Sequence, residues 1–358
     1  MGIRATAQGA CLRLSELTTI GLGGPARRLI DAVSDDQVID AVAAADAAGE
    51  PLLVIAGGSN VVIADDGFEG TVVRILTQGV AADNDGDRVR LCAAAGQTWD
   101  GLVARAVAED LTGIECLSGI PGSAGATPIQ NVGAYGQEVA QTIVGVRTYD
   151  RRDRIVRDLS NRDCNFAYRS SRFRRSDRHV VLAMTYELER SSLARPVRYA
   201  GLAAALGVEL GARPPLPAVR EAVLSLRRQK GMVVDRDDPD SVSVGSFFVN
   251  PVMPAERFAA LERRVAHRVG EAGRAPAWPE TGGRVKTSAA WLIERSGFPR
   301  GYRKGRAGIS EKHTLALINR GGATTAELIA LAREIRDGVR GAFGVTLQTE
   351  PVLVGVEL

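Results

Sequence analysis

Residues 119–138, GIPGSAGATPIQNVGAYGQE, contain five glycines and two prolines within twenty positions. Glycine weakens helices and strands through its conformational freedom, and proline removes a backbone donor, so neither a helix nor a long strand fits this stretch. Yet Ile120, Ile129, Val132 and Tyr135 give it more apolar surface than a solvated linker carries. The sequence therefore predicts an ordered, glycine-dense loop that approaches another part of the site closely.

A second glycine-rich stretch, AGGSN at residues 56–60, lies between two apolar runs that read as strands. Consecutive small residues expose backbone N–H groups, which can form an anion-binding concavity. Taken alone, this stretch fits a plain tight turn equally well. With two such loops in one unit, we expect backbone wrapped around a long, phosphate-bearing ligand. The uncharged side chains available to hydrogen-bond that ligand are Ser59, Asn60, Ser118, Ser123, Thr127, Gln130 and Asn131.

The rest of the chain mixes helical and strand patterns without a regular βαβ repeat, which predicts an α+β fold. Ser34 and Thr98 each precede a helical pattern and are suited to cap it. Residues 21–26, GLGGPA, resemble a dinucleotide-binding turn only weakly, because no strand pattern precedes them and Pro25 stands where the helix would begin. We expect two short strands within residues 345–358.

The chain of 358 residues is 45% hydrophobic and carries a net charge of +3, which is typical of a globular protein with two or three structural units. No apolar run approaches the roughly 20 residues of a membrane span. The first twenty residues lack the apolar core of a secretory signal. We therefore expect a cytoplasmic protein that binds no membrane.

The cysteines and histidines form no metal or disulfide pattern. Cys11, Cys92, Cys116 and Cys164 are scattered and form no CxxC, which favours reduced, small core residues. The three histidines form no HxH or HExxH, so we expect no metal site. Residues 147–178 are rich in arginine, but interleaved aspartates and few aromatic residues argue against nucleic acid as a partner.

Five motifs make the chain similar to a known family. They are IAGGSNVVIADDGFEG at residues 55–70, GIPGSAGATPIQNVGAYGQE at 119–138, YRSSRF at 168–173, VGSFFVNP at 244–251 and TEPVLVG at 349–355. In this order they resemble the UDP-N-acetylenolpyruvoylglucosamine reductases, which make UDP-N-acetylmuramate for bacterial peptidoglycan. The likeness runs from about residue 17 to residue 356, nearly the whole chain.

The resemblance implies a two-lobed FAD-binding domain of the vanillyl-alcohol-oxidase/PCMH type, with noncovalent FAD, and a smaller α+β substrate-binding domain. The FAD-binding domain then covers residues 1–232, with lobes 1–80 and 81–232, and the substrate-binding domain covers 233–358, its last strand returning to the first lobe. The residues that match FAD contacts are Ala56, Gly57, Gly58, Ser59, Asn60, Ser118, Gly119, Pro121, Gly122, Gly125, Ala126, Thr127, Gln130, Asn131, Gly133, Ala134 and Tyr135.

The resemblance also implies NADPH as the reductant and a vinyl ether bearing a carboxylate as the acceptor. Hydride from flavin N5 adds to the methylene, and negative charge develops on the neighbouring carbon. Arg169 matches the residue that grips the carboxylate, and Ser246 matches the proton donor. Glu350 matches a carboxylate that either holds Arg169 or, if protonated, hydrogen-bonds the enolate-like intermediate. Phe247 and Phe248 would keep the pocket dry.

Substrate contacts follow from the same resemblance. The longer form of the family carries a loop with a substrate-contacting tyrosine, which Tyr199 in PVRYAGL matches. Lys230 and Asn250 match further substrate contacts, and the charge of Lys230 suits a diphosphate. Lys286 or Lys304 would serve the extra phosphate of NADPH. We expect a monomer whose partners are small molecules.

Two alternatives stay open from the sequence. An oxidase of alcohols or hydroxy acids on the same flavin fold often holds FAD covalently through histidine or cysteine, and Cys116 lies just before the second glycine-rich loop. Release of flavin on denaturation would argue against that reading. A nonenzymatic nucleotide-binding protein is disfavoured by the joint presence of Arg169, Ser246 and Glu350.

Overall fold

The computed structural model describes residues 13–270 and 273–358, and the contacts among them divide the chain into two compact units. Unit 1 holds residues 26–58 and 68–233. Unit 2 holds residues 13–25 and 59–67 together with the described part of residues 234–358. Cys11 lies outside the described residues. The units are described separately below.

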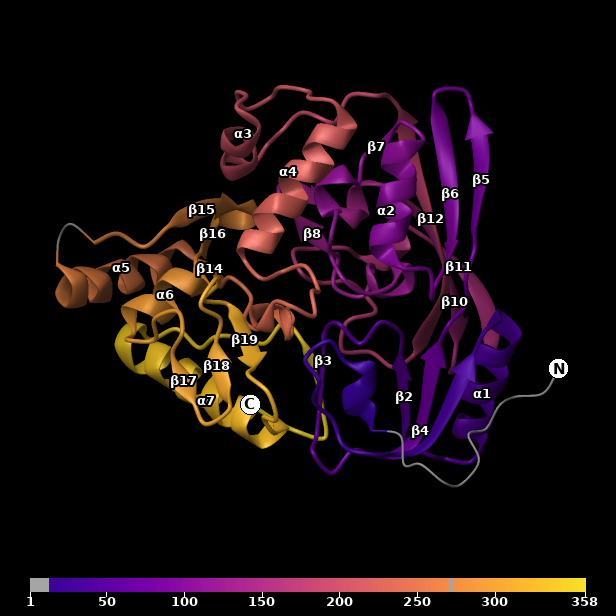
Figure 1. Cartoon of the computed structure of the whole chain (residues 1–358), viewed down its shortest axis with the longest axis horizontal. Helices are drawn as coiled ribbons and strands as arrows, with labels where there is room; N and C mark the ends of the chain where they lie inside the picture. Colours follow the sequence, from indigo (N-terminus) through magenta and orange to yellow (C-terminus); the bar gives the residue numbers. More distant parts are fainter. Residues whose placement is uncertain (1–12, 271–272) are drawn as a thin grey trace. The chain divides into compact units, whose positions relative to one another are not determined.

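Unit 1 begins with a three-stranded parallel sheet in the order β1–β4–β2, with α1 packed against β1 and β4 (Figure 1). The elements are β1 Ala26–Ala32, α1 Asp35–Ala47, β2 Leu52–Ile55 and β4 Phe68–Ile75. Ser34 caps α1 by accepting a hydrogen bond from Gln37 N at 3.3 Å, which confirms that prediction. The strand β1 was not predicted. It makes this region a βαβ unit, and it also means that GLGGPA leads into a strand rather than the helix of a dinucleotide-binding turn.

A larger antiparallel sheet follows in the order β11–β10–β12–β6–β5, and β7 pairs with the end of β12. Helix α4 packs against α2 and α3, and β8 pairs with β9 in a short hairpin. Thr98 precedes α2, but its side chain makes no capping hydrogen bond, so that prediction is wrong. The elements are β5 Val80–Asp85, β6 Arg88–Ala94, α2 Trp99–Ala108, β7 Leu111–Thr112, β8 Gly133–Ala134, β9 Gln137–Glu138, β10 Ile143–Asp150, β11 Ile155–Ser160, β12 His179–Arg190, α3 Ala200–Leu206 and α4 Leu216–Gln229.

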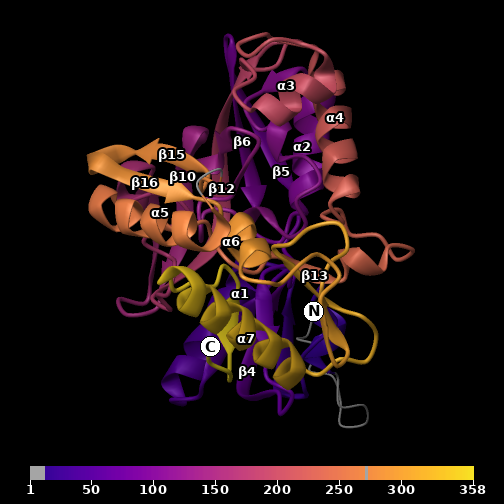
Figure 2. The same ribbon diagram turned by 90° about the vertical axis from the view of Figure 1, so that its left-hand side faces the viewer.

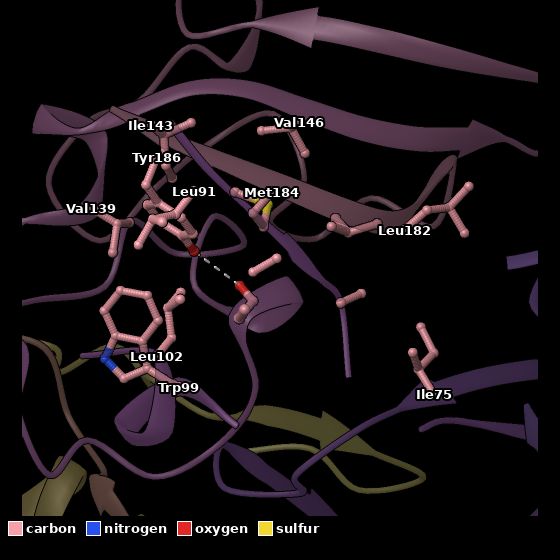
Figure 3. Packing of buried hydrophobic residues seen from close by; sticks show 14 of the residues in the cluster. Ile75, Leu91, Trp99, Leu102, Val139, Ile143, Val146, Leu182, Met184 and Tyr186 are labelled. Carbon is pink, nitrogen blue, oxygen red and sulfur yellow. Dashed lines mark hydrogen bonds between the residues drawn. The ribbon is translucent and has the colours of Figure 1, made fainter. Parts of the chain in front are cut away.

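The main core of unit 1 lies between α2 and the larger sheet. Trp99 on α2 and Tyr186 on β12 are fully buried, with their ring centroids 5.5 Å apart (Figure 3). Cys116 and Cys164 are also buried, as expected of small core residues. Cys92 is exposed, so the prediction of a core position is wrong for that residue. It lies on the outward face of β6, where alternate residues point to solvent.

Three arginines of the arginine-rich stretch, Arg151, Arg157 and Arg178, pair with aspartates. Asp150, at the end of β10, is fully buried and accepts from Arg178 Nη2 at 2.7 Å and from Arg157 Nε at 3.2 Å. Arg151 pairs with Asp46 of α1 at 2.6 Å. The pairs of Asp150 join segments of the larger sheet, and the pair of Arg151 with Asp46 joins the turn after β10 to α1.

Unit 2 contains two small antiparallel sheets and the helices that cover them. The sheet β13–β19–β18–β17 packs against α7, and the sheet β14–β16–β15 packs against α5, as Figure 2 shows for β16. Its core includes Phe247, Phe248 and Phe343. The elements are β13 Ser243–Ser246, β14 Val252–Pro254, α5 Ala255–Val269, β15 Ala277–Glu280, β16 Arg284–Thr287, α6 Ala289–Arg295, β17 Arg303–Lys304, β18 Ala307–Ile309, β19 Ala316–Asn319 and α7 Thr325–Phe343.

The C-terminal end of the chain runs back to the residues after AGGSN. Strand β20, Val352–Val354, pairs in parallel with β3, Val61–Ile63. Only one of the two strands expected within residues 345–358 forms, because Thr349 makes just an isolated bridge with Phe248. The contact division assigns β3 and β20 to the same unit.

Within residues 13–270 and 273–358, no helix is both long and apolar enough to cross a membrane. The same residues contain no group of three or more histidine, cysteine, aspartate or glutamate side chains that could hold a metal ion.

Asp150→Asn should lower the unfolding temperature at pH 7, because it removes the buried charge that faces Arg178 and Arg157. Hydrogen bonding from Arg178 holds the pKa of the Asp150 carboxyl far below its usual range. The carboxylate therefore stabilises the fold above its unfolded pKa of about 3.9, and this contribution is lost as pH falls toward the folded pKa.

Thermal unfolding of variant and wild type should therefore converge as pH falls below about 4. Asp177→Asn is the matched control, since the Asp177 side chain is 92% exposed and lies 3.5 Å from Arg151. An Asp150→Asn defect that stayed constant down to acid pH would contradict this account.

Candidate functional site

The two glycine-rich loops meet within unit 1. A Cβ built on Gly57 would lie 2.7 Å from the Cα of Gly122, closer than real Cβ atoms approach a backbone. Gly122 itself has a φ of +112°, which L side chains rarely adopt. Only glycine at both positions allows the two backbones to touch. Gly57 thus lies against the second loop shortly after the end of β2.

Side chains of the second loop mostly hold the loop itself. Ser118 Oγ donates to Glu115 O at 2.7 Å, and Thr127 Oγ1 lies 2.8 Å from the Tyr186 hydroxyl. Asn131 donates to Glu138 at 2.8 Å and accepts from Ala140 N at 3.1 Å. The sequence predicted that these three side chains would serve a ligand, and that stays a prediction. In the structure they brace the backbone.

Ser123 differs from its neighbours in the loop. Its Oγ is buried and has no hydrogen-bond partner. The adjacent backbone is pinned on both sides, with Gly122 O accepting from Trp99 N at 3.0 Å and Ala124 N donating to Gln97 O at 2.8 Å. The orphaned hydroxyl is therefore held in place rather than free to rotate away with its backbone.

Asp100 is a residue that the sequence did not reveal. Its Oδ1 accepts from Gly119 N at 2.6 Å, and both carboxylate oxygens accept from Arg220, at 2.7 and 2.8 Å. Burial raises the pKa of Asp100, but the hydrogen bonds from Arg220 and Gly119 outweigh it and leave the pKa below its usual value. The charged carboxylate fixes the start of the loop. In sequence it looks like an ordinary acidic residue in the first turn of a helix.

The other residues of the second loop that match FAD contacts differ in burial and local structure. Gly125 lies against Ala95, where a Cβ would come within 2.5 Å of the Ala95 Cβ, and Gly125 N donates to Ala95 O at 2.9 Å. Ala126 is exposed at a single helical turn, Ala124–Ala126. Pro121 and Gln130 are half-buried, and Gly133 and Ala134 form β8.

Arg169 stands at the tip of a tight turn. The turn is closed by Ala167 N donating to Ser170 O at 3.0 Å and Ser170 N donating to Ala167 O at 3.1 Å. Arg169 has a φ of +49°, and its Nη2 donates to Gly133 O at 2.7 Å. A non-glycine residue at positive φ costs conformational energy, and such strain concentrates at functional sites. The fold thus orients this guanidinium against the glycine-rich loop.

Tyr135, a predicted FAD contact, forms a cluster in unit 1 with Tyr199 and Lys230, which are predicted substrate contacts. The rings of Tyr135 and Tyr199 meet edge to face with centroids 5.4 Å apart. Lys230 Nζ lies 5.9 Å from the centroid of Tyr135, at the end of α4. Burial, followed by the neighbouring charge of Arg227, lowers the pKa of Lys230. Tyr135 also has a positive φ, of +49°.

Ser246, Glu350 and Asn60 lie on three segments of unit 2 that are connected by hydrogen bonds. Ser246 ends β13 and lies opposite Ala316 of β19. Glu350 N donates to Phe247 O at 2.9 Å, which places Glu350 beside the residue that follows Ser246. Asn60 Nδ2 lies 3.5 Å from Glu350 O, and Val352 N donates to Asn60 O at 3.0 Å. Ser59 and Asn60 belong to this unit, unlike the first three residues of AGGSN.

Phe247 and Phe248 are almost completely buried, with ring centroids 5.1 Å apart. They anchor the end of β13 in the core of unit 2. Asn250 Oδ1 accepts from Ala289 N at 3.0 Å, at the start of α6. That bond orients the side-chain amide, whose NH₂ group can donate to a ligand.

The two lysines considered for the extra phosphate of NADPH both have acidic partners. Lys286 Nζ pairs with Glu280 at 2.5 Å, and Lys304 Nζ pairs with Glu334 at 2.6 Å. A phosphate at either lysine would have to compete with a carboxylate.

Two family models match the chain. Residues 26–158 match an FAD binding domain. Residues 238–354 match the C-terminal domain of UDP-N-acetylenolpyruvoylglucosamine reductase. The first match contains both glycine-rich loops, and the second contains Ser246, Asn250 and Glu350.

Curated relatives match almost the whole chain. UDP-N-acetylenolpyruvoylglucosamine reductase of Thermobifida fusca is 56% identical over 96% of this chain and 97% of the relative. The reductase of Streptomyces coelicolor is 58% identical over 96% of this chain and 90% of the relative. The crystal structure of UDP-N-acetylenolpyruvylglucosamine reductase from Thermus caldophilus shares the fold, with a TM-score of 0.66 at 21% identity over 99% of this chain and 100% of the other. The predicted fold class, an FAD-binding domain of the PCMH type with a smaller α+β domain, is confirmed. The chain belongs to the UDP-N-acetylenolpyruvoylglucosamine reductase family.

Proposed function

We propose that this protein reduces UDP-N-acetylenolpyruvoylglucosamine to UDP-N-acetylmuramate with NADPH, using noncovalently bound FAD. The observation that carries the proposal is family membership over 96% of the chain. When bound, FAD supplies the hydride that is added to the enolpyruvyl methylene. The chain's own residues then have three tasks: to hold the substrate carboxylate, to supply a proton and to bind the diphosphate.

The glycine-rich loops of unit 1 fit a bound FAD. Gly57 and Gly122 leave bare backbone where the loops meet, and Ser123 Oγ is a buried polar atom without a protein partner. Buried polar groups are rarely left unpaired in native proteins, so a polar ligand atom beside Ser123 is the natural partner. The FAD contacts that we propose are the loop residues named in the sequence, with backbone N–H groups doing much of the binding because several side chains are already engaged.

Arg169 is proposed to bind the substrate carboxylate. Its guanidinium keeps its charge throughout the reaction and presents paired donors to a carboxylate. The hydrogen bond to Gly133 O fixes the plane of the group in advance, so little reorganisation is needed when charge develops on the substrate. The strained φ of Arg169 is consistent with a side chain placed for this task.

Ser246 is proposed to donate the proton to the carbon on which negative charge develops. A serine hydroxyl is a weak acid, but the carbanion is a strong base, so the transfer remains favourable. Glu350 is tied to the residue after Ser246 through the Phe247 carbonyl, which supports a joint role at the reacting carbon. We propose that Glu350 holds Arg169 or hydrogen-bonds the enolate-like intermediate.

Tyr199, Lys230 and Asn250 are proposed substrate contacts. The positive charge of Lys230 suits a diphosphate. The ring of Tyr135 contacts both Lys230 and Tyr199, so the two proposed contacts lie on either side of it. The oxygen of Asn250 accepts from Ala289 N, which orients the side-chain amide. Its NH₂ group can then donate to phosphate or carboxylate oxygens of a substrate.

An oxidase on the same flavin fold is not favoured by the relatives. The chemistry of Cys116 points the same way. Cys116 was the cysteine nearest the second glycine-rich loop, but it is buried, and burial raises the pKa of its thiol. A thiol that is seldom ionised is a poor nucleophile for covalent attachment of flavin.

We also propose a cytoplasmic monomer that serves peptidoglycan synthesis, and through it cell shape and division, without nucleic acid or membrane as a partner. The buried, unpaired Cys116 and Cys164 suit a reducing compartment. Asp150 pairs with Arg157 and Arg178, so part of the positive charge of that stretch is neutralised within it.

Gly57→Ala should cause the protein to lose FAD, because the added Cβ has to push the second loop away from Gly122. Gly145→Ala is the matched control, since a Cβ there meets Thr185 at an ordinary 3.7 Å. The flavin retained per polypeptide after gel filtration and the thermal unfolding temperature report both effects. Full flavin occupancy in Gly57→Ala would show that the contact does not shape the FAD site.

Ser246→Ala should still allow NADPH to bleach the flavin but should stop the enolpyruvyl sugar nucleotide from restoring its colour, because the proton donor is missing. Stopped-flow absorbance under anaerobic conditions separates the two half-reactions. Ser296→Ala, which alters a serine that donates to Leu292 O within α6, is the control and should behave as wild type. Normal turnover by Ser246→Ala would rule out Ser246 as the acid.

A further inference from the structure

Arg227, on the last turn of α4, has a buried Nε that lies against Gly119 of the second glycine-rich loop. Its Nη2 donates to Met232 O at 2.6 Å, but its Nε is buried and has no hydrogen-bond partner. The Nε lies 3.5 Å from the position of a Cβ built on Gly119, the first glycine of the loop. The hydrogen bond to Met232 O satisfies Nη2, whereas the Nε N–H has no acceptor among the described residues.

The charge of Arg227 also lacks a counter-ion. In the part of the chain that the structure describes, no carboxylate oxygen lies within ion-pair distance of it. Asp100 is the carboxylate whose charge acts on the pKa of Arg227, but both of its oxygens already accept hydrogen bonds from Arg220. Burial lowers the pKa of Arg227 to about 10, with Tyr135 and Asp100 acting in the opposite sense. The group therefore remains charged at neutral pH.

A second cation lies next to it. Lys230 follows Arg227 by one helical turn, and the charge of Arg227 contributes to lowering the pKa of Lys230. Two like charges in a partly desolvated place repel one another unless an anion lies between or beside them. The negative end of the α4 dipole offsets only part of that cost. A buried N–H without an acceptor and an unbalanced pair of cations point to the same missing group, an anion with several oxygens.

We propose that Arg227 binds a phosphate oxygen of a nucleoside diphosphate through its Nε, with Lys230 as the second cation of the same site. This inference rests on the proposed function, which requires two such groups, the diphosphate of FAD and that of the UDP-sugar. Gly119 belongs to the proposed FAD loop and Lys230 to the proposed substrate contacts, so either diphosphate is chemically suited to Arg227. Arg227 is therefore a proposed binding residue that lies outside the five sequence motifs.

The test uses the FAD-loaded full chain with Arg227→Gln, which removes the charge and the paired donors. Calorimetry measures the affinity for UDP and for uridine, and the fluorescence of flavin released on dilution measures the affinity for FAD. We expect the affinity for UDP or for FAD to fall at least about tenfold, as loss of one charge-assisted hydrogen bond predicts, while the affinity for uridine stays within about twofold. A loss confined to UDP identifies the substrate diphosphate, and a loss confined to FAD identifies the cofactor.

Arg228→Gln is the matched control, because Arg228 is the next residue of the same helix, is exposed and pairs with Glu221 at 3.2 Å. The proposal is overturned if Arg227→Gln retains the UDP and FAD affinities of this control. It is also overturned if UDP and uridine weaken equally, because that pattern reports a distorted pocket rather than a lost phosphate contact.

If Arg227→Gln does not fold, Arg227→Lys carries the test. Lysine keeps the charge but cannot place a donor at the Nε position, so affinity for UDP or FAD should still fall severalfold with uridine unchanged. Unchanged affinities for both diphosphates in Arg227→Lys would overturn the proposal. A wild-type protein that binds neither UDP nor FAD would instead refute the proposed function.

Discussion

The contact between Gly57 and Gly122 is the constraint on which the glycine-rich region of unit 1 depends. The two backbones lie so close that Gly57 has no room for a side chain, and Gly122 has a φ of +112°, which side-chain-bearing residues rarely adopt. From this contact the second loop is fixed in two further ways: Gly122 O accepts from Trp99 N, and Asp100 accepts from Gly119 N. Helix α2 thus contributes Trp99 to the hydrophobic core and also makes hydrogen bonds to the loop that we assign to FAD. The same helix therefore supports both the packing of the core and the proposed binding surface.

Much of this fold could be predicted from local patterns. The α1 cap at Ser34, the buried strands and the ordered character of residues 119–138 all follow from composition and spacing. Strand β1 could not, since its exposed arginines hide the alternation that marks a strand, and its place is set by pairing with β4 forty residues later. The isolated bridge at Thr349 was mistaken for a strand because its partner, Phe248, is a hundred residues away.

The candidate site shows the same division. The motifs led to Arg169, Ser246 and Glu350, and the structure gives Arg169 a strained, oriented position and links Glu350 to the residue after Ser246. Asp100 and Arg227 could not be found this way, since their importance lies in what their side chains meet in space. On the sequence, each is one more charged residue on an amphipathic helix. Conversely, Ser118 and Asn131 looked like ligand donors, yet their side chains serve the loop.

The central claim is that one FAD carries reducing equivalents from NADPH to an enolpyruvyl sugar nucleotide. The most direct measurement is the absorbance of the protein-bound flavin under anaerobic conditions, as NADPH and then UDP-N-acetylenolpyruvoylglucosamine are added. The account predicts bleaching by NADPH followed by full recovery with the sugar nucleotide. Bleaching that only oxygen reverses, or no flavin band even after addition of FAD, would contradict it.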